Sequence, residues 1–363
     1  MSRRVLITVS GFVPAGADVA VAARRRPRID YVEISKVVDA DILDYSAVER
    51  IQGQVGRLVQ RIVGRNAALA LQCVLARRKY DVILTDGEQI GLPFAVLASF
   101  FRRTSLPRHV MIVHVLSVTK KSSLYRFLRL GRRIDEMVVY SSAQRDFISG
   151  RLGYPAAKIT LSNFMVDTAF FDSTVVDAGS WRSGTPVIAA AGLEFRDYPT
   201  MLKAVDGLNA RVVLAAASPW SKRSSALEGL APPTNVEIVR LDLAQLRELY
   251  RTSTLVVVPL CETDFQAGVT TLLEAMSMGK PVICSRTSGQ TDVIVDGVTG
   301  VYVPPSDASA MRLAIEDLLA DPARADAIGS AARQWVVGHA DIDVYVAQLG
   351  DRINFQQKLA TNS

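Results

Sequence analysis

The residues with the clearest chemistry lie between positions 261 and 282, in the stretch CETDFQAGVTTLLEAMSMGKPV. Gly268 lies in a polar turn, and a helical pattern of apolar residues begins at about Thr270. The free backbone N–H groups and the dipole of such a helix N-terminus bind anions, typically phosphate. One turn inside the helix, the carboxylate of Glu274 is placed to face whatever binds there. The alternative is an ordinary crossover helix with a solvated glutamate.

Two predicted strands hold this stretch in place. Residues 254–260 form a short apolar run with the length and β-branched content of a buried parallel strand. Gly279 and Pro281 end the helical pattern, and residues 282–284 begin the next strand. The stretch is therefore a strand, a glycine-containing loop and a helix N-terminus. In open α/β sheets, ligands bind at this end of the strands.

The same alternation of strand and helix runs through the whole chain. Strands are predicted in the first half at residues 5–9, 31–35, 80–85, 109–114, 137–141 and 158–161, with helices at 46–78, 92–101, 122–133 and 142–152. Strands are predicted in the second half at 187–191, 211–215, 236–239, 254–259, 281–284 and 300–303, and the last helices at 307–320, 323–338 and 341 to about 359. Two such halves predict two parallel sheets covered by helices on both faces.

A chain of 363 residues is longer than one usual hydrophobic core. The pattern loosens around residues 166–184, so we predict one domain over 1–168 and a second over 169–340. The helix from about 341 is expected to pack back on the first domain. In two stacked domains of this kind, the natural ligand site is the cleft between them.

Composition predicts a globular protein, because 49% of the residues are hydrophobic and 21% are charged. No run of 18 apolar residues suggests a membrane span, and the apolar stretch at the N-terminus is too short for a signal peptide. The three cysteines, Cys73, Cys261 and Cys284, are too few for a disulfide framework, and their apolar contexts predict buried, reduced thiols. The three histidines, His109, His114 and His339, are too few for a histidine-rich metal centre. We therefore expect a cytoplasmic protein without a bound metal.

The charge is concentrated in the first half. Residues 1–170 hold 26 Lys and Arg against 14 Asp and Glu, whereas residues 171–363 hold 16 against 22. The stretch 50–80 has seven basic residues and no acid, and the stretch 101–134 has nine and no acid. Such a surface suits an anionic membrane or a phosphorylated partner, or it serves only solubility. Nucleic acid is not expected, since no zinc-finger spacing, RNP-like aromatic run or basic tail is present.

Four motifs resemble those of glycosyltransferases of the GT-B fold, in particular the large family 4 of retaining enzymes. Residues 273–283, LEAMSMGKPVI, are similar to the family motif L-E-A-M-A-x-G-x-P-V-V, and residues 288–305 resemble its G-G-x-x-E-x-x-x-D-G-x-x-G-x-x-V-P-P run. Residues 156–171 resemble the segment that joins the two domains, and residues 191–200 a shortened G-R-x-x-x-x-K-G loop. The resemblance covers most of 137–338 and implies an α/β fold with two Rossmann-like domains facing a central cleft.

The resemblance implies transfer of a sugar from a nucleotide-diphosphate sugar, with retention and without a metal or other cofactor. The donor would be bound by Arg196, the N–H groups of Gly268, Val269 and Thr270, and Glu274, which would accept the ribose hydroxyls. An ordinary surface ion pair of Arg196 with Asp197 or Glu194 is the alternative for the arginine.

Two positions depart from the family pattern. The family pairs two glutamates eight positions apart, and Gln266 stands eight before Glu274. Leu193 stands where the family usually has its first phosphate-binding arginine. A catalytically inactive GT-B subunit that binds a nucleotide sugar or acts as a scaffold is therefore the alternative function.

Three residues of the first half are expected at the cleft. Gly11 follows the first strand, where the family loop approaches the donor phosphate. His114 resembles the histidine on the acceptor side of many members, and Glu88 could orient an acceptor hydroxyl. Together with Gln266 and Glu274, His114 completes the candidate catalytic set. The acceptor is expected to be lipid-linked, with the basic first domain on the inner face of a membrane, or a small soluble molecule.

Overall fold

The computed structural model describes residues 4–49, 54–174, 184–216 and 231–354, without the side chains of 54–63. These residues form two compact units. Unit 1 comprises Met1–Ala17, Ile29–Ser162 and Tyr345–Ser363, and unit 2 comprises Asp18–Arg28 and Asn163–Val344. The second segment of unit 1 ends at Ser162, before the predicted bound of 168, and Val166 pairs with Asp341 within unit 2. Residues 175–183 of the predicted boundary, 50–53 of the basic stretch and 355–359 of the last helix lie outside the described residues.

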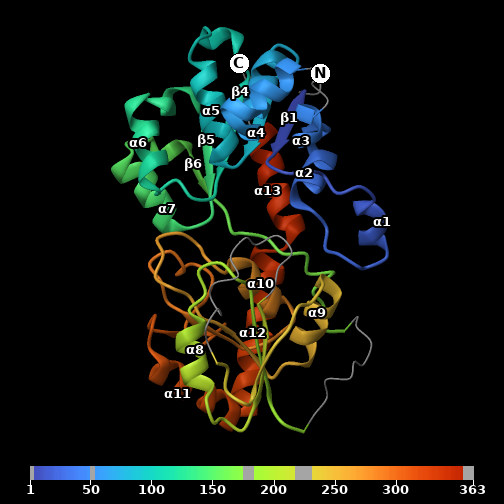
Figure 1. The fold of residues 1–363 in the computed structure, drawn as a ribbon, viewed down its shortest axis with the longest axis vertical. Coiled ribbons are helices and arrows are strands. Elements are labelled where there is room, and N and C mark those ends of the chain that lie inside the picture. Colours follow the sequence, from blue (N-terminus) through green and yellow to red (C-terminus); the bar gives the residue numbers. More distant parts are fainter. Residues whose placement is uncertain (1–3, 50–53, 175–183, 217–230, 355–363) are drawn as a thin grey trace. The chain divides into compact units, whose positions relative to one another are not determined.

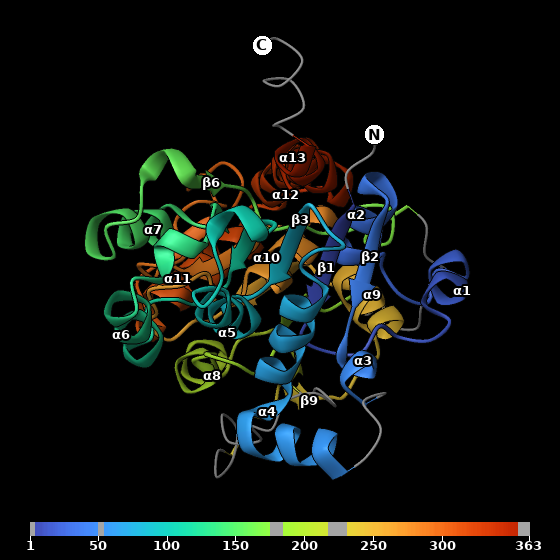
Figure 2. The same ribbon diagram turned by 90° about the horizontal axis from the view of Figure 1, so that it is seen from above.

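Unit 1 contains a parallel sheet of six strands in the order β2-β1-β3-β4-β5-β6. Its strands are β1 (Val5–Val9), β2 (Ala40–Leu43), β3 (Val82–Asp86), β4 (Arg108–Val113), β5 (Glu136–Val139) and β6 (Ile159–Leu161). The α-helices of this part of the chain are α1 (Ala17–Ala22), α2 (Asp30–Val38), α3 (Tyr45–Glu49), α4 (Gln54–Ala76), α5 (Glu88–Ala98), α6 (Thr119–Phe127) and α7 (Ser142–Asp146). Helices α4 and α5 pack against each other, as Figure 2 shows.

Unit 2 contains a second parallel sheet, in the order β12-β11-β10-β7-β8-β9. Its strands are β7 (Val187–Ala191), β8 (Arg211–Ala215), β9 (Val236–Ile238), β10 (Leu255–Val258), β11 (Val282–Ser285) and β12 (Val301–Val303). Its α-helices are α8 (Tyr198–Val205), α9 (Leu243–Thr252), α10 (Val269–Ser277), α11 (Ala308–Ala320) and α12 (Pro322–His339), and α13 (Ile342–Asn354) follows. Figure 1 shows these elements in sequence colours.

The unit 2 sheet is buried on both faces, which is why its strands read as continuous apolar runs. All five residues of β7 and all four of β10 are buried. One face packs against apolar residues of α9 and α10, and the other against residues of α8 and α11. The prediction of two parallel α/β sheets covered by helices is confirmed.

One predicted strand is wrong. Residues 31–35 lie in the helix α2, and the strand of this region is β2, at 40–43. Tyr31-Val-Glu-Ile-Ser alternates as a strand would, but Ile34 and Val38, four residues apart, are the buried pair. Asp30 and Glu33 in the first turn also favour the helix through its dipole.

Other predictions differ in detail. Helix α5 begins at Glu88 instead of Leu92, so Pro93 lies inside it. The predicted helix 142–152 is α-helical only to Asp146, after which residues 147–151 form a π-helix. Cys73 and Cys284 are buried as expected, but Cys261 is exposed. None of the helices in the described ranges combines the length and apolar character needed to cross a bilayer.

The C-terminal helix is attached to unit 1 through residues from Tyr345 onward. The hydroxyl of Tyr345 lies 2.8 Å from that of Tyr140, and both tyrosines are buried. Ser162 Oγ donates to Gln348 Oε1 at 2.7 Å, and Arg108 Nη1 donates to the carbonyl oxygen of Arg352 at 2.7 Å. These contacts lie within unit 1 and hold its two far-separated segments together.

The strand orders fix where a ligand can bind in each unit. In unit 2 the order reverses between β7 and β10, and in unit 1 between β1 and β3. Loops that leave the carboxyl ends of such neighbouring strands run to opposite faces of the sheet and leave a crevice between them. The loops at these points begin at Gly192 and Pro259 in unit 2, and at Ser10 and Gly87 in unit 1.

Candidate functional site

The loops after β7 and β10 are held against each other in unit 2. The backbone N–H of Cys261 donates to the carbonyl of Phe195 at 3.0 Å, and that of Asp197 donates to the carbonyl of Pro259 at 3.0 Å. Arg196 and Leu260 form an isolated antiparallel bridge between these contacts. The crevice at the strand-order reversal therefore has a fixed backbone.

The N-terminus of α10 opens beside these loops. Its N-cap, Gly268, has φ of 74° and gives the helix no side-chain cap, so the first N–H groups are left for another partner. A Cβ at position 268 would lie 2.8 Å from Leu260 Cδ2 and 3.2 Å from Arg196 Nη1. Only glycine suits both this backbone angle and this space. Thr270 is exposed at the open end of the helix, and Val269 is buried.

Arg196 lies behind this helix terminus and is 8% exposed. Its Nε donates to the carbonyl of Ala191 at 3.0 Å, its Nη1 to the carbonyl of Glu194 at 2.9 Å, and its Nη2 to Thr271 Oγ1 at 3.1 Å. The side chain is therefore directed to backbone carbonyls and to α10 rather than to the Asp197 carboxylate, which caps α8. Its charge adds to the positive end of the α10 dipole.

Glu274 lies one turn further along α10 and is 7% exposed. Its Oε2 accepts a hydrogen bond from the hydroxyl of the buried Tyr250 at 3.0 Å. Burial raises the pKa of the Glu274 carboxyl from 4.5 to about 7, while the Tyr250 hydroxyl and the Arg196 charge oppose this shift. A carboxylate kept in so apolar a place is costly, which is typical of groups retained for a ligand.

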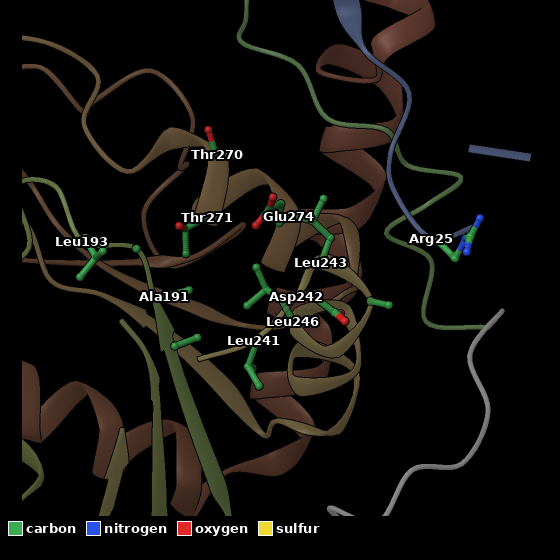
Figure 3. Close-up of a pocket in the computed structure, with 13 residues that line it drawn as sticks. Arg25, Ala191, Leu193, Leu241, Asp242, Leu243, Leu246, Thr270, Thr271 and Glu274 are labelled. Carbon is green, nitrogen blue, oxygen red and sulfur yellow. The ribbon is translucent and has the colours of Figure 1, made fainter. Parts of the chain in front are cut away.

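Glu274 and Thr271 line a pocket of about 660 Å³, shown in Figure 3. The rest of its wall is largely apolar and comes from the ends of β7 and β8, the loops after β7 and β9 and the start of α9, including Leu193, Leu241, Leu243 and Leu246. The size and the mixture of apolar wall with a few polar groups suit a nucleotide. Leu193 thus lies in the pocket wall, where it brings no charge.

Arg25 also lines this pocket, although it lies far from the other lining residues in sequence. It belongs to the segment Asp18–Arg28, which is part of unit 2. Sequence reasoning missed it because the segment was assigned to the first domain. The run Arg24-Arg25-Arg26 before Pro27 was the available signal.

Gln266 lies in the loop before α10, and its Oε1 is buried without a hydrogen-bond partner among the described residues. In the loop after β11, Gln290 Oε1 and Thr287 Oγ1 are also buried without a hydrogen-bond partner among the described residues. The two loops are packed tightly, since a Cβ at Gly289 would overlap the backbone of Phe265. These three polar atoms therefore lie in two adjoining loops next to the N-terminus of α10.

The corresponding edge of unit 1 carries Gly11 and the other predicted residues. Gly11 follows β1, and its carbonyl accepts the N–H of Tyr45 at 2.9 Å. Ser10 Oγ accepts a hydrogen bond from Gln89 Nε2 at 2.8 Å, which ties the loop after β1 to α5. A Cβ at position 11 would meet no atom within 4 Å, so this loop is open on the Gly11 side.

Glu88 is 2% exposed and holds the loop after β4. Its carboxylate accepts the backbone N–H groups of His114 and Val115, at 2.9 and 3.3 Å. It also accepts Lys121 Nζ at 2.5 Å. Glu88 therefore fixes the position of His114. These hydrogen bonds occupy the carboxylate that was predicted to orient an acceptor hydroxyl.

His114 forms a pair with Asp86 at the end of β3. Its Nε2 lies 3.1 Å from Asp86 Oδ1, and its side chain is 38% exposed. Burial lowers the pKa of His114, but the hydrogen bond and charge of Asp86, with Glu88 and Asp30, outweigh it and raise the pKa. The pKa of Asp30 is raised to about 6 by burial and by the Asp86 charge. Within the described ranges, no cluster of three or more His, Cys, Asp or Glu side chains could hold a metal ion.

Replacing Asp86 by asparagine should lower the pKa of His114. The amide keeps a hydrogen-bond acceptor but removes the negative charge that favours the imidazolium form. Histidine with a raised pKa stabilises the fold most at low pH, and this contribution is lost as the pH rises through the folded pKa. An NMR titration of the His114 ring signals in both proteins measures the shift. An unchanged pKa would show that Asp86 does not control this histidine.

The structure brings the predicted residues together in two groups. The unit 2 group surrounds the N-terminus of α10 and comprises Arg196, Gly268, Val269, Thr270 and Glu274, with Gln266 in the adjoining loop. The unit 1 group comprises Gly11, Glu88 and His114. Tyr250 and Asp86 were missed. Asp86 could have been noted as the last residue of a strand, whereas Tyr250 lies 24 residues from its partner and gives no sequence signal.

Known proteins resemble part of this sequence. Residues 183–335 match the family model "Glycosyl transferases group 1". Over 65 residues, 18% of this chain and 17% of the relative, the chain is 45% identical to the GDP-mannose-dependent alpha-(1-6)-phosphatidylinositol monomannoside mannosyltransferase of Mycolicibacterium smegmatis. Over 227 residues, 58% of this chain and 52% of the relative, it is 26% identical to the glycogen synthase of Mycobacterium tuberculosis. The chain therefore spans about half or less of the length of these curated relatives.

Solved structures resemble the chain over nearly its whole length. Sucrose-phosphate synthase from Thermosynechococcus elongatus has a TM-score of 0.74 at 18% identity, covering 99% of this chain and 100% of its own. HepE of Anabaena, in complex with UDP-glucose, has a TM-score of 0.71 at 16% identity, covering 98% and 100%. Residues 183–335 thus match the glycosyl transferases group 1 family, and the chain has the α/β fold with two Rossmann-like domains that is called GT-B, as its motifs predicted.

Proposed function

We propose that the protein is a glycosyltransferase that moves a sugar from a nucleotide-diphosphate sugar to an acceptor. The observation that carries this proposal is the buried Glu274 in a pocket of nucleotide size, one turn from an uncapped helix N-terminus. The carboxylate suits a ribose diol, and the helix terminus suits a diphosphate. The group 1 family match over 183–335 supports the same reaction.

The donor diphosphate would lie on the N–H groups of Gly268, Val269 and Thr270. Arg196 would act through its charge and by holding the loop after β7 against α10, because its guanidinium is already bonded to two carbonyls and to Thr271. Gln266 would supply a neutral acceptor for a sugar hydroxyl, since its Oε1 has no partner among the described residues. His114 and Asp86 would serve on the acceptor side.

The reaction would need no metal. The bond between the anomeric carbon and the diphosphate oxygen breaks, and its electron pair leaves with the diphosphate. The helix terminus and Arg196 stabilise that charge, which is the part a metal ion plays in other sites. The acceptor hydroxyl oxygen then bonds to the anomeric carbon on the same face of the sugar, and its proton passes to the departing diphosphate oxygen. The configuration is therefore retained, as in the family that residues 273–283 and 288–305 resemble.

Donor turnover tests this reaction. With UDP-glucose, GDP-mannose and ADP-glucose as donors, release of sugar or transfer to added acceptors should continue in the presence of EDTA. NMR of the product should show the anomeric configuration of the donor. Complete loss of turnover in EDTA, restored by Mn²⁺, would contradict the metal-free reaction. Binding without any turnover would favour a non-catalytic, nucleotide-sugar-binding protein.

The acceptor is proposed to be lipid-linked, because α6 and the turn after it carry both apolar and basic exposed side chains. Phe127 is 86% exposed, Leu124 is 42% exposed and Leu128 is 41% exposed. Exposed basic residues accompany them: Lys120, Arg126, Arg129 and Arg132. Such a mixture is typical of segments that lie in the interface of an anionic membrane.

Replacing Phe127 by serine should weaken binding to vesicles of phosphatidylcholine and phosphatidylglycerol several-fold, because an inserted aromatic ring is lost. Co-sedimentation measures the bound fraction at low and moderate salt. Leu313→Ser, which changes a side chain 66% exposed on unit 2, is the control and should bind as the unmodified protein does. Absence of salt-sensitive binding in the unmodified protein would remove the membrane proposal and favour a soluble acceptor.

A further inference from the structure

The segment Asp18–Arg28 is anchored to unit 2 from both sides of Arg25. Arg28 donates from its backbone N–H to Asp167 Oδ2 at 2.8 Å and from Nε to Asp167 Oδ1 at 3.1 Å. The other end of the same guanidinium donates to both carboxylate oxygens of Asp343, at 2.6 and 3.2 Å. Paired hydrogen bonds of this kind fix both position and orientation.

The chain is also held immediately before Arg25. Arg24 has φ of 53°, and its carbonyl accepts Arg247 Nη1 at 3.4 Å. The N–H of Arg25 donates to the carbonyl of Ala20 at 2.9 Å and closes the turn after α1. Arg25 is therefore delivered to the pocket by a segment with fixed ends.

The Arg25 side chain lines the pocket and is exposed. Among the described residues no hydrogen bond or ion pair engages its guanidinium, in contrast to that of Arg28. The charged groups that share the pocket with it are Glu274 and Asp242, and the Asp242 carboxylate accepts the N–H of Gln245 as the cap of α9. Arg25 is thus a cation of the pocket that is available to a ligand.

The position of Arg25 along the pocket determines which part of the ligand it can contact. Figure 3 shows Thr271 and Leu193 on one side of Glu274, and Arg25 on the other, beyond Leu243. In the proposed function the diphosphate lies at the α10 terminus and the ribose at Glu274. The nucleobase then extends toward the apolar start of α9, which is the Arg25 end.

We propose that Arg25 binds the nucleobase of the donor, so that its guanidinium recognises the nucleoside rather than the phosphates. A guanidinium is planar, stacks on aromatic rings and donates to ring carbonyl or nitrogen acceptors. This inference rests on the proposed function, because it assumes that the pocket holds a nucleotide.

Calorimetric titration of the full chain with UDP and UMP, GDP and GMP, and ADP and AMP tests the assignment. For the nucleotides of the base that the unmodified protein prefers, Arg25→Ala should weaken binding of the diphosphate and of the monophosphate by the same factor. We expect about tenfold, as for the loss of one cation–π contact. Arg24→Ala removes the same charge one residue away, outside the pocket lining, and should leave both affinities unchanged.

Three results would overturn the assignment. The first is unchanged nucleotide affinity in Arg25→Ala, and the second is an equal loss of affinity in Arg24→Ala. The third is a loss of affinity in Arg25→Ala that is much larger for the diphosphate than for the monophosphate, which would place Arg25 on the phosphates. Failure of the unmodified protein to bind any of the six nucleotides would overturn the proposed function together with this assignment. Thermal melting of both variants checks that each is folded.

Discussion

Glu274→Gln should abolish sugar transfer and at the same time make the protein more stable at pH 8. The amide has one acceptor oxygen where the ionised carboxylate has two, so it cannot hold both ribose hydroxyls. We expect turnover to fall by on the order of 100-fold or more, as when one oriented group of a preorganised site is removed. Initial rates with the best donor, at saturating and at low concentrations, measure this loss.

The gain in stability follows from the raised pKa of Glu274. Burial raises that pKa from 4.5 to about 7, so between these values the folded protein holds a proton that the unfolded chain has lost. The stabilising contribution of the protonated acid is complete below pH 4.5 and is lost as the pH rises through 7. The amide of the Glu274→Gln variant has no charge to bury. At pH 8 the free energy of unfolding of this variant should therefore exceed that of the unmodified protein by up to about 3 kcal/mol.

Urea unfolding of both proteins at pH 5 and pH 8 separates this effect from a general change in packing. The difference in stability should be small at pH 5 and should grow toward pH 8. A variant that is equally stable at both pH values would contradict the raised pKa, and one that keeps its turnover would contradict the role of Glu274.

Arg196→Lys should also remove most activity, although the positive charge is kept. A lysine has three donors on one atom and cannot reach the carbonyls of Ala191 and Glu194 and the Thr271 hydroxyl together. At least one buried acceptor would be left unsatisfied, at a cost of roughly 1–3 kcal/mol. The loop after β7 would then no longer be held against α10, and we expect turnover to fall by about 100-fold.

Arg211→Lys is the matched control, because Arg211 also lies in unit 2 and its side chain is 36% exposed in a surface pair with Glu237. It should change neither turnover nor melting temperature measurably. If Arg196→Lys behaved like this control, Arg196 would be a structural residue without influence on the diphosphate.

The fold was predictable because strands buried on both faces appear as apolar runs that sequence reveals directly. β7 and β10 are examples. The error at residues 31–35 arose where alternation predicted a strand and tertiary packing of Ile34 and Val38 stabilised a helix. A short amphipathic segment carries both periodicities, and the contacts that decide between them are not local.

The site was predictable where its residues follow one another along a loop and helix, as Gly268 and Glu274 do. It was not predictable where folding brings distant residues together. The hydroxyl of Tyr250 reaches Glu274 from α9, and Arg25 reaches the pocket from a segment that belongs to the other half of the sequence. Arg196 was predicted to bind the donor phosphates directly, but its guanidinium donates to the carbonyls of Ala191 and Glu194 and to the Thr271 hydroxyl.

The most direct test of a nucleotide-sugar site in unit 2 is a calorimetric titration with UDP-glucose, GDP-mannose and ADP-glucose. Each donor is titrated into the unmodified protein and into the Glu274→Gln variant, in the presence of EDTA, at pH 6 and at pH 8. One donor should bind the unmodified protein, more tightly at pH 8, because Glu274 then accepts both ribose hydroxyls as a carboxylate. The variant should bind that donor at least tenfold more weakly at pH 8, with little dependence on pH. Equal binding by both proteins, or binding of none of the three donors, would contradict the account.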